Sequence, residues 1–416
     1  MKSLTSFLST VALLLLGPST LALDIDKKLE LVIQVHQLQP ARCIAAPSLI
    51  EPALNSLGEA VFTTNILSGD RDVSCSTCHL DKAALTDGLS LSVGVGGVGE
   101  GVDRLYSKGV IVPRNAFTLF GRAHPDFTTF FWDGKVLEKD GVIFSPIGEG
   151  ESKGFRSALA VAAVLPILAR DEFLGKLSPL DENPNISHIN SSYYEEKIQA
   201  ANAVLNTILN SQEPDAKKLK QAFMDSGAPH FDLALVGNAL ASFIATKLQK
   251  DCTPSAWEQY LAGNRHALTR SQKDGALLFY GKGRCAACHS GSLQTDFSFH
   301  SIGSPQGEFG THIHGQDIGR AGVTYESADR FQFRTPPLFY VSETAPYGHN
   351  GIFPTLEDVV TFHLNPLLFM ERYPWATEKT KFTYNKVLTS RSALLGYIEI
   401  SSEEELGKVL DFLSTF

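Results

Sequence analysis

Two copies of one short motif decide how this chain is interpreted: CSTCH at Cys75–His79 and CAACH at Cys285–His289. In each copy, two cysteines three positions apart are followed at once by a histidine: Cys75, Cys78 and His79, then Cys285, Cys288 and His289. On one helical turn, positions i, i+3 and i+4 lie on the same face. Two thiols can therefore form thioethers with the two vinyl groups of a haem, while the imidazole binds its iron from below. The spacing predicts two covalently bound c-type haems.

Two other chemistries use closely spaced cysteines, and neither explains the motifs. A zinc site would need a second ligand pair at zinc-finger spacing, which the chain lacks. A thioredoxin-like redox pair would not need a histidine directly after each second cysteine. Cys43 and Cys252 remain outside the motifs. They either form a disulfide or stay as two buried thiols, and the sequence does not separate these alternatives.

The composition is that of a folded protein. The 416 residues include 43% hydrophobic side chains, and 45 acidic against 36 basic residues give a formal charge of −9. This composition excludes a disordered chain, and the length predicts two domains. Mild acidity without a basic stretch argues against a nucleic-acid partner. Six cysteines are too few for a disulfide-dense scaffold.

The N-terminus has the layout of a signal peptide at residues 1–22. Lys2 precedes a short apolar core at Val11–Leu16, and Thr20–Ala22 offers a small-residue cleavage site. The apolar core is shorter than the roughly 20 residues that a membrane span needs. We therefore expect no membrane span and a periplasmic protein.

A weak internal duplication accompanies the motifs. Leu57–Phe62 precedes the first, and the similar phrase Gly275–Gly283 precedes the second. Helical periodicity runs through Leu49–Phe62, Leu233–Leu248, Ser271–Phe279 and Glu403–Phe416, whereas no alternating strand pattern is sustained. The glycine-rich stretch Ser90–Asp103 predicts a loop. We expect an N-terminal haem domain over residues 23–255 and a C-terminal one over 256–416.

From about Leu57 onward, the chain resembles the bacterial di-haem cytochrome c peroxidases and the related MauG-type enzymes. The landmarks that carry the resemblance are the first motif, Arg114–Ala116, Phe130–Gly134, Thr344–Gly351 and Thr355–Val360. The resemblance implies an all-α fold of two cytochrome c-like domains, each with one haem, on either side of the domain interface. It also implies that the N-terminal haem reacts with hydrogen peroxide and that the C-terminal haem accepts electrons.

The family takes the second ligand of the C-terminal haem from the position eight residues after the threonine that matches Thr355. That ligand is methionine in the peroxidases and tyrosine in the MauG-type enzymes, and here it is His363. We expect bis-histidine ligation by His289 and His363. Imidazole in place of a thioether lowers the reduction potential.

For the N-terminal haem, the resemblance implies His79 as the proximal ligand. Family peroxidases have a distal histidine soon after the first motif, but Leu80–Arg122 contains none, and His124 lies beyond the expected loop. This departure predicts an open or water-bound iron, as in the MauG-type enzymes, and no histidine that must leave on activation.

Peroxide cleavage needs a proton moved between its two oxygens, which a carboxylate can do. A family segment carries a glutamine, a proline and a glutamate. Ala158–Phe173 matches it with Ala162 in place of the glutamine, with Pro166 and with Glu172 as the expected acid–base group. About 20 residues, Leu137–Arg156, are inserted before this segment, and they contain the rival candidates Glu149 and Glu151.

Two further expectations follow from the resemblance. Trp132 matches a tryptophan that relays electrons between the haems. Asn115, with the backbone carbonyls of Thr344 and Pro346, matches a calcium site at the domain interface. Oxygen donors suit that hard cation.

Three functions are consistent with these residues. The first is a peroxidase that reduces hydrogen peroxide with electrons from a small cytochrome c or cupredoxin. The second is a MauG-type oxidase that acts on a protein substrate. The third is a di-haem electron-transfer protein without peroxide chemistry. The sequence leaves the donor, the reduction potentials and the oligomeric state open, with a homodimer among the expectations.

Overall fold

The computed structural model describes residues 24–104, 109–147, 154–175, 193–306, 316–372 and 378–416. The predicted signal peptide and the rival candidates Glu149 and Glu151 lie outside these residues. None of the helices in the described part is long and apolar enough to cross a membrane.

Helices dominate the described chain. The longer helices are α1 (Ile25–Val35), α2 (Pro52–Thr63), α4 (Ala158–Val164), α6 (Tyr194–Leu209), α7 (Pro214–Ser226), α8 (Leu233–Asp251), α9 (Ala256–Leu261), α10 (Arg270–Tyr280), α12 (Leu356–Leu364), α13 (Pro366–Arg372), α14 (Glu378–Thr389) and α15 (Glu403–Leu413). Single turns are α3 (Cys75–Cys78), α11 (Ala321–Thr324), η1 (Pro47–Leu49), η2 (Asp81–Ala83), η3 (Gly101–Asp103), η4 (Leu165–Leu168), η5 (Arg170–Leu174), η6 (Cys285–Ala287), η7 (Ser327–Asp329) and η8 (Ala393–Tyr397).

Two small antiparallel sheets, which the sequence analysis did not predict, interrupt the helices. One contains β1 (Thr129–Phe130), β2 (Val136–Lys139) and β3 (Val142–Phe144) in chain order, with Leu137 paired to Thr129 on one side and to Phe144 on the other. The other pairs β4 (Phe299–His300) with β5 (Phe333–Arg334). Strands of two to four residues are too short for alternation to be visible in a sequence.

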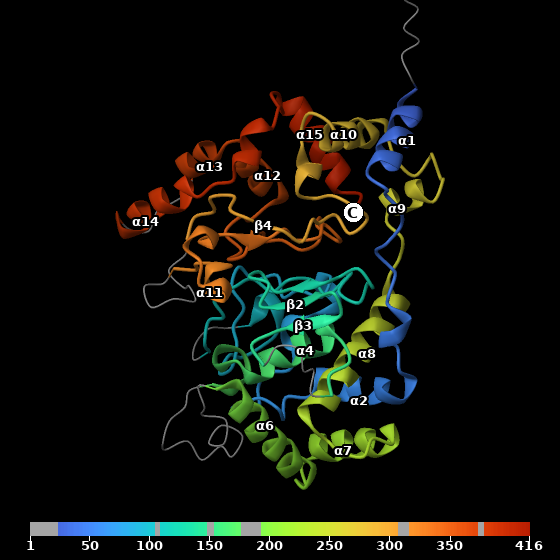
Figure 1. Cartoon of the computed structure of the whole chain (residues 1–416), viewed down its shortest axis with the longest axis vertical. Helices are drawn as coiled ribbons and strands as arrows, with labels where there is room; N and C mark the ends of the chain where they lie inside the picture. The colour runs from blue at the N-terminus through green and yellow to red at the C-terminus, as the bar shows by residue number, and fades with distance from the viewer. Residues whose placement is uncertain (1–23, 105–108, 148–153, 176–192, 307–315, 373–377) are drawn as a thin grey trace, which may run out of the picture.

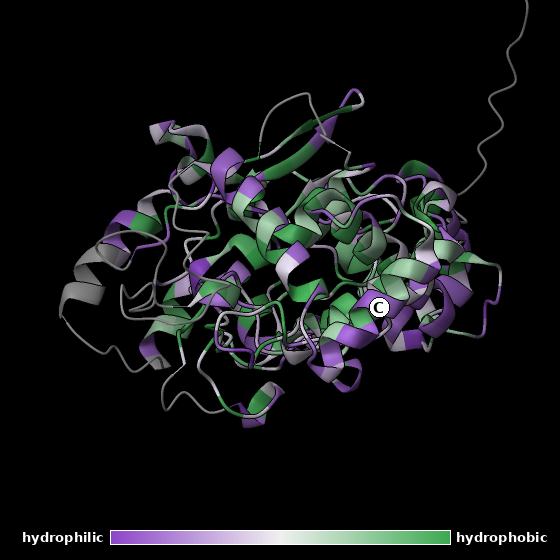
Figure 2. Cartoon of the chain, turned by 90° about the horizontal axis from the view of Figure 1, so that it is seen from below, coloured by the Kyte–Doolittle hydropathy of each residue, from purple (hydrophilic) through white to green (hydrophobic). Residues whose placement is uncertain are grey.

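The molecule has two halves, one above the other in Figure 1. The lower half contains α2, α4, α6, α7, α8 and the three-stranded sheet, and the upper half contains α9 to α15. Separate clusters of buried residues fill the two halves: one includes Leu57, Val161 and Leu240, and another includes Trp257 and Phe412. Figure 2 shows the corresponding hydropathy, with hydrophobic segments gathered inside and hydrophilic ones around them.

The same helix crossing occurs once in each half. A Cβ added at Gly58 of α2 would lie 2.1 Å from the carbonyl oxygen of Ala239 in α8. A Cβ added at Gly275 of α10 would lie 1.9 Å from the carbonyl oxygen of Lys408 in α15. Only glycine allows backbones to approach this closely. Because each crossing involves the helix that precedes a CxxCH motif, the weak duplication in the sequence corresponds to a repeated packing arrangement.

Helix α1 packs with the upper half, which the sequence analysis did not anticipate. Leu29 is completely buried in the cluster that contains Trp257. The carboxylate of Asp26 pairs with Lys273 Nζ of α10 at 2.7 Å and accepts a hydrogen bond from the Tyr260 hydroxyl at 2.8 Å. The chain therefore passes from the upper half to the lower half and returns between α8 and α9.

A disulfide joins these two passages. Cys43 lies between α1 and α2, and Cys252 directly follows α8. Their Cα atoms are 5.4 Å apart although 209 positions separate them in the sequence. Of the two alternatives for these cysteines, the structure therefore has the disulfide.

Candidate functional site

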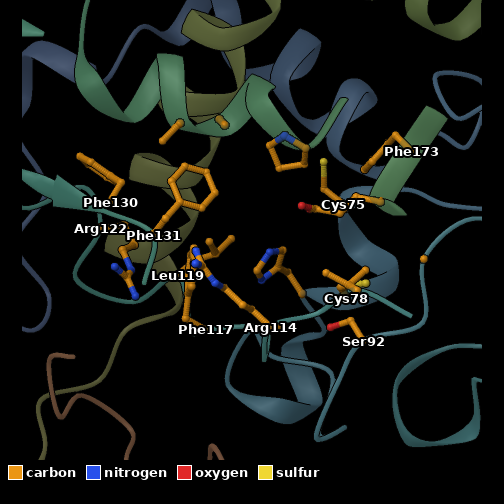
Figure 3. Close-up of a pocket in the computed structure, with 18 of the residues that line it drawn as sticks. Cys75, Cys78, Ser92, Arg114, Phe117, Leu119, Arg122, Phe130, Phe131 and Phe173 are labelled. Carbon is orange, nitrogen blue, oxygen red and sulfur yellow. The ribbon is translucent and has the colours of Figure 1, made fainter. Parts of the chain in front are cut away.

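The first cavity has a volume of about 270 Å³ and lies in the lower half. Cys75 and Cys78 of α3 and the following His79 form part of its wall. Figure 3 shows the two cysteines and Phe173 at one side, with Phe130, Phe131 and Arg122 at the other. Ser74 holds the motif in place because it caps α3 in a reciprocal arrangement with Thr77.

The second cavity, of about 240 Å³, lies in the upper half. Its wall contains Cys285, Cys288 and His289, and also His363. His363 occupies the last turn of α12, a helix whose start is fixed by a capping box between Thr355 and Asp358. Two histidines that are far apart in the sequence therefore line one cavity, and their binding of one haem iron stays a prediction.

The three histidines are held in the same way. Nδ1 hydrogen-bonds a backbone carbonyl at His79 (Leu85, 2.8 Å), at His289 (Gln294, 3.2 Å) and at His363 (Val359, 2.7 Å). A carbonyl oxygen can only accept, so Nδ1 carries the proton in each neutral ring. Nε2 is then left with a lone pair for a metal ion.

Burial keeps these rings neutral. It lowers the pKa of His79 and of His363, and together with the neighbouring His363 it lowers the pKa of His289 to about 4. An uncharged imidazole is the form that binds metals.

None of the four motif cysteines is in a disulfide. Burial raises the pKa of Cys75 and of Cys285 to about 12, and it also raises the pKa of Cys78. A reactive dithiol needs a lowered pKa and a positively charged environment. Cys75, Cys78 and Cys285 therefore lack the lowered pKa of a thiol redox pair.

A shared wall separates the two cavities. Five residues line both: Asn115, Ala116, Phe117, Arg122 and Trp132. The Trp132 indole donates a hydrogen bond from Nε1 to the Asn115 carbonyl at 3.0 Å. Its own carbonyl accepts from the backbone N–H of Arg334 at 2.8 Å. Trp132 is thus fixed between the cavities, where a relay would have to lie.

The predicted acid–base segment also reaches the first cavity. Ala162, Pro166 and Glu172 all line it. Glu172 lies in η5, a single π-helical turn, a local geometry that is common at functional sites. Burial raises the pKa of the Glu172 carboxyl, against the opposing effect of the positive charge of Lys135. Lys135, which the sequence analysis did not single out, lines the same cavity.

The glycine-rich loop supports this turn. A Cβ at Gly94 would lie 1.8 Å from the carbonyl oxygen of Asp171, the residue before Glu172. Gly94 therefore allows the loop to pack directly on the backbone that carries the Glu172 carboxylate, and Gly94 and Glu172 both line the first cavity.

Among the described residues that line the first cavity, His79 is the only histidine. His124 does not line the cavity, and its Nδ1 accepts a hydrogen bond from the backbone N–H of Asp126 at 3.1 Å. The described lining of the first cavity thus has one histidine, and that of the second has four: His289, His300, His349 and His363.

The three predicted calcium ligands, Asn115, Thr344 and Pro346, line the second cavity. The Asn115 side-chain nitrogen donates to the Leu89 carbonyl at 2.9 Å, so its amide oxygen is the atom that could bind a cation. Oxygen donors of this kind are compatible with calcium.

An ion-paired arginine joins the halves beside the shared wall. Arg114 binds both carboxylate oxygens of Asp317, at 2.7 and 2.9 Å, and one of Asp133 at 2.6 Å. Burial alone would raise the pKa of Asp317, but Arg114 lowers it to about 2. In the sequence, Arg114 is one of the landmarks of the family resemblance, and no local pattern there predicts this ion pair.

The fold and the paired cavities define a helix-rich protein with a CxxCH site in each half. The chain belongs to the di-haem cytochrome c peroxidase family, whose sequence model matches residues 52–266. This family implies two haems and an oxidoreductase activity.

The relatives of this chain include proteins named cytochrome c peroxidase and proteins named MauG. The cytochrome c peroxidase Ccp of Escherichia coli is 29% identical over 79% of this chain, and the match spans 57% of that protein. The methylamine utilization protein MauG of Methylorubrum extorquens is 27% identical over 78% of this chain and 74% of its own length. In fold, the chain is similar to a MauG-like protein associated with microbial copper homeostasis, with a TM-score of 0.59 at 21% identity, covering 91% of this chain and 93% of that one.

Proposed function

We propose that the protein is a periplasmic di-haem peroxidase. It reduces hydrogen peroxide to two molecules of water with two protons and two electrons, and it takes the electrons from a small cytochrome c or cupredoxin. The observation that carries the proposal is a difference between two cavities that each contain a CxxCH motif in their wall. In its described lining, the first has the single histidine His79 and the carboxylate of Glu172, while its other carboxylate, Asp133, is paired with Arg114. The second has both His289 and His363, besides His300 and His349.

The residues present fit a haem in each cavity. Both cysteines of each motif are free for thioether bonds, and each histidine presents an unprotonated Nε2. Cys75, Cys78 and His79 would hold one haem in the lower half, which contains the proposed domain at residues 23–255 apart from α1. Cys285, Cys288, His289 and His363 would hold the other in the domain at 256–416. Haem iron supplies the electron transfer and the position at which peroxide binds.

The chain's own groups then perform the proton transfer. The Glu172 carboxylate accepts the proton of the inner peroxide oxygen and donates it to the outer one, which leaves as water. Pro166 and Phe173 restrict the space around this carboxylate, since both line the cavity. Trp132, fixed in the shared wall, is the proposed route for electrons between the halves. A calcium ion held by Asn115, Thr344 and Pro346 would stabilise that wall. Export by a cleaved signal peptide at residues 1–22 is part of the same proposal.

One observation favours a second function. The first cavity has no second histidine among its described lining residues, which is the pattern of a MauG-type oxidase acting on a protein substrate. A protein used only for electron transfer would instead need two protein ligands for each haem iron.

The absorption and electron paramagnetic resonance spectra of the purified holoprotein test the proposal. We expect two haems per chain, one low-spin and one high-spin, with the high-spin signal changing when peroxide is added. Turnover of peroxide with a reduced small cytochrome c then distinguishes the peroxidase from the MauG-type oxidase. Two low-spin haems that do not respond to peroxide would leave electron transfer as the function.

A further inference from the structure

Two buried arginines lie beside the shared wall. Arg122 has 2% of its surface exposed and lines both cavities, and Arg334 has 1% exposed and lines the second. The ring of Phe127 lies close to both: its centroid is 4.6 Å from the guanidinium carbon of Arg122 and 5.6 Å from that of Arg334. Two like charges are therefore held near each other inside the protein.

Their hydrogen bonds go to neutral groups. Arg122 donates from Nε to the Thr118 carbonyl at 3.1 Å. Arg334 donates from Nε to the Phe131 carbonyl at 3.0 Å and from Nη1 to the Thr335 carbonyl at 2.9 Å. Arg122 Nη1 is buried without a hydrogen-bond partner among the described residues.

Neither guanidinium has a counter-ion in the described part of the chain, where no carboxylate forms an ion pair with Arg122 or Arg334. The neighbouring Arg114, by contrast, forms ion pairs with two carboxylates. Burial lowers the pKa of Arg334 to about 9. Burial, together with the charge of Arg334, also lowers the pKa of Arg122. An unpaired buried charge costs several kcal/mol, so an anion from outside the described polypeptide is expected here.

We propose that Arg122 and Arg334 bind the propionate carboxylates of the two haems. This inference rests on the proposed function, because it needs the haems to be present. Haem carries its propionates on the edge opposite the vinyl groups, and thioether bonds at Cys75 and Cys78 would fix the vinyl edge of the first haem. Arg122 lies across the cavity from these cysteines in Figure 3. We assign Arg122 to the haem at Cys75 and Arg334 to the haem at Cys285, since Arg334 lines only the second cavity.

The reduction potential of each haem in the holoprotein tests the assignment. A positive charge near a haem favours the ferrous state, so Arg122→Met should lower the ferrous-to-ferric ratio of the first haem at a fixed potential. We expect a change of about tenfold, which is 59 mV for a one-electron couple. Arg334→Met should do the same to the second haem, and Arg122→Lys and Arg334→Lys should recover most of each loss. The matched control is Arg330→Met, because Arg330 is exposed and lines neither cavity.

Changes below twofold in both methionine variants would overturn the inference. So would potentials of the unmodified protein that follow the phosphate concentration, since the arginines would then bind a free inorganic anion. If a variant does not fold, resonance Raman spectra of the unmodified holoprotein supply the second measurement. The propionate bending bands should not shift as the pH falls towards about 4, near the usual carboxyl pKa, and a shift there overturns the inference. Absence of haem would refute the proposed function itself, whereas two haems with insensitive potentials would refute only the role of the arginines.

Discussion

Replacing Glu172 by glutamine removes the proposed proton carrier while keeping the size of the side chain. Glu172 lines the first cavity, and the other carboxylate in its described lining, Asp133, is paired with Arg114. General acid–base groups contribute about 10²–10⁴-fold to a rate. We therefore expect Glu172→Gln to slow peroxide cleavage by about 100-fold or more, which corresponds to about 2.7 kcal/mol of transition-state stabilisation. Stopped-flow mixing of the holoprotein with peroxide measures this step directly.

The pH dependence gives a second, independent measure of the same role. Burial raises the pKa of Glu172 above its ordinary value of 4.5. The carboxylate form must accept the first proton, so the wild-type rate should fall as the pH drops through this raised pKa. The Glu172→Gln variant has no such group and should lose the transition.

The control is Glu59→Gln, because Glu59 is exposed on α2 and lines neither cavity. It should leave both the rate and the pH profile unchanged. A Glu172→Gln variant with the wild-type rate, or with the wild-type pH profile at a reduced rate, would show that another group moves the proton.

Three further changes test other parts of the structure. His363→Ala should convert the second haem to high-spin, and two remaining low-spin signals in electron paramagnetic resonance would contradict the ligation. Gly94→Ala should displace the turn that carries the proposed acid and slow peroxide cleavage about tenfold or more, whereas Gly407→Ala, which has open space around it, should not. The double variant Cys43→Ser/Cys252→Ser should lower the free energy of unfolding by about 2–5 kcal/mol; an unchanged thermal midpoint under non-reducing conditions would count against that contribution.

The sequence predicts well those helices whose positions depend on nearby residues, through hydrophobic periodicity, prolines and helix caps. Periodicity over Leu233–Leu248 and Ser271–Phe279 corresponds to α8 and α10, with ends within three residues. The expected helix at Leu49–Phe62 is divided, since Pro47 starts η1 and Pro52 starts α2. His363 was expected from the family resemblance, and the cap at Thr355 fixes the register of the helix that brings it to the second cavity.

What the sequence does not predict depends on contacts between distant residues. The pairing of Cys43 with Cys252 and the packing of α1 on α10 join segments more than 200 positions apart, and no local pattern records them. Arg122 and Arg334 look like ordinary surface arginines in the sequence, because an unpaired buried arginine is rare. Only the fold brings Arg122 and Arg334 to the walls of the cavities.

The docking of α1 in the upper half has a consequence for how the chain matures. A polypeptide emerges from the ribosome or translocon with its N-terminus first, but α1 packs against α10, which begins at Arg270. Nearly two thirds of the chain must therefore be synthesised before α1 can pack against α10. The disulfide of Cys43 likewise cannot form before Cys252 has been synthesised. Until then this segment remains accessible to chaperones and proteases, and the lower half can fold and receive its cofactor independently of it.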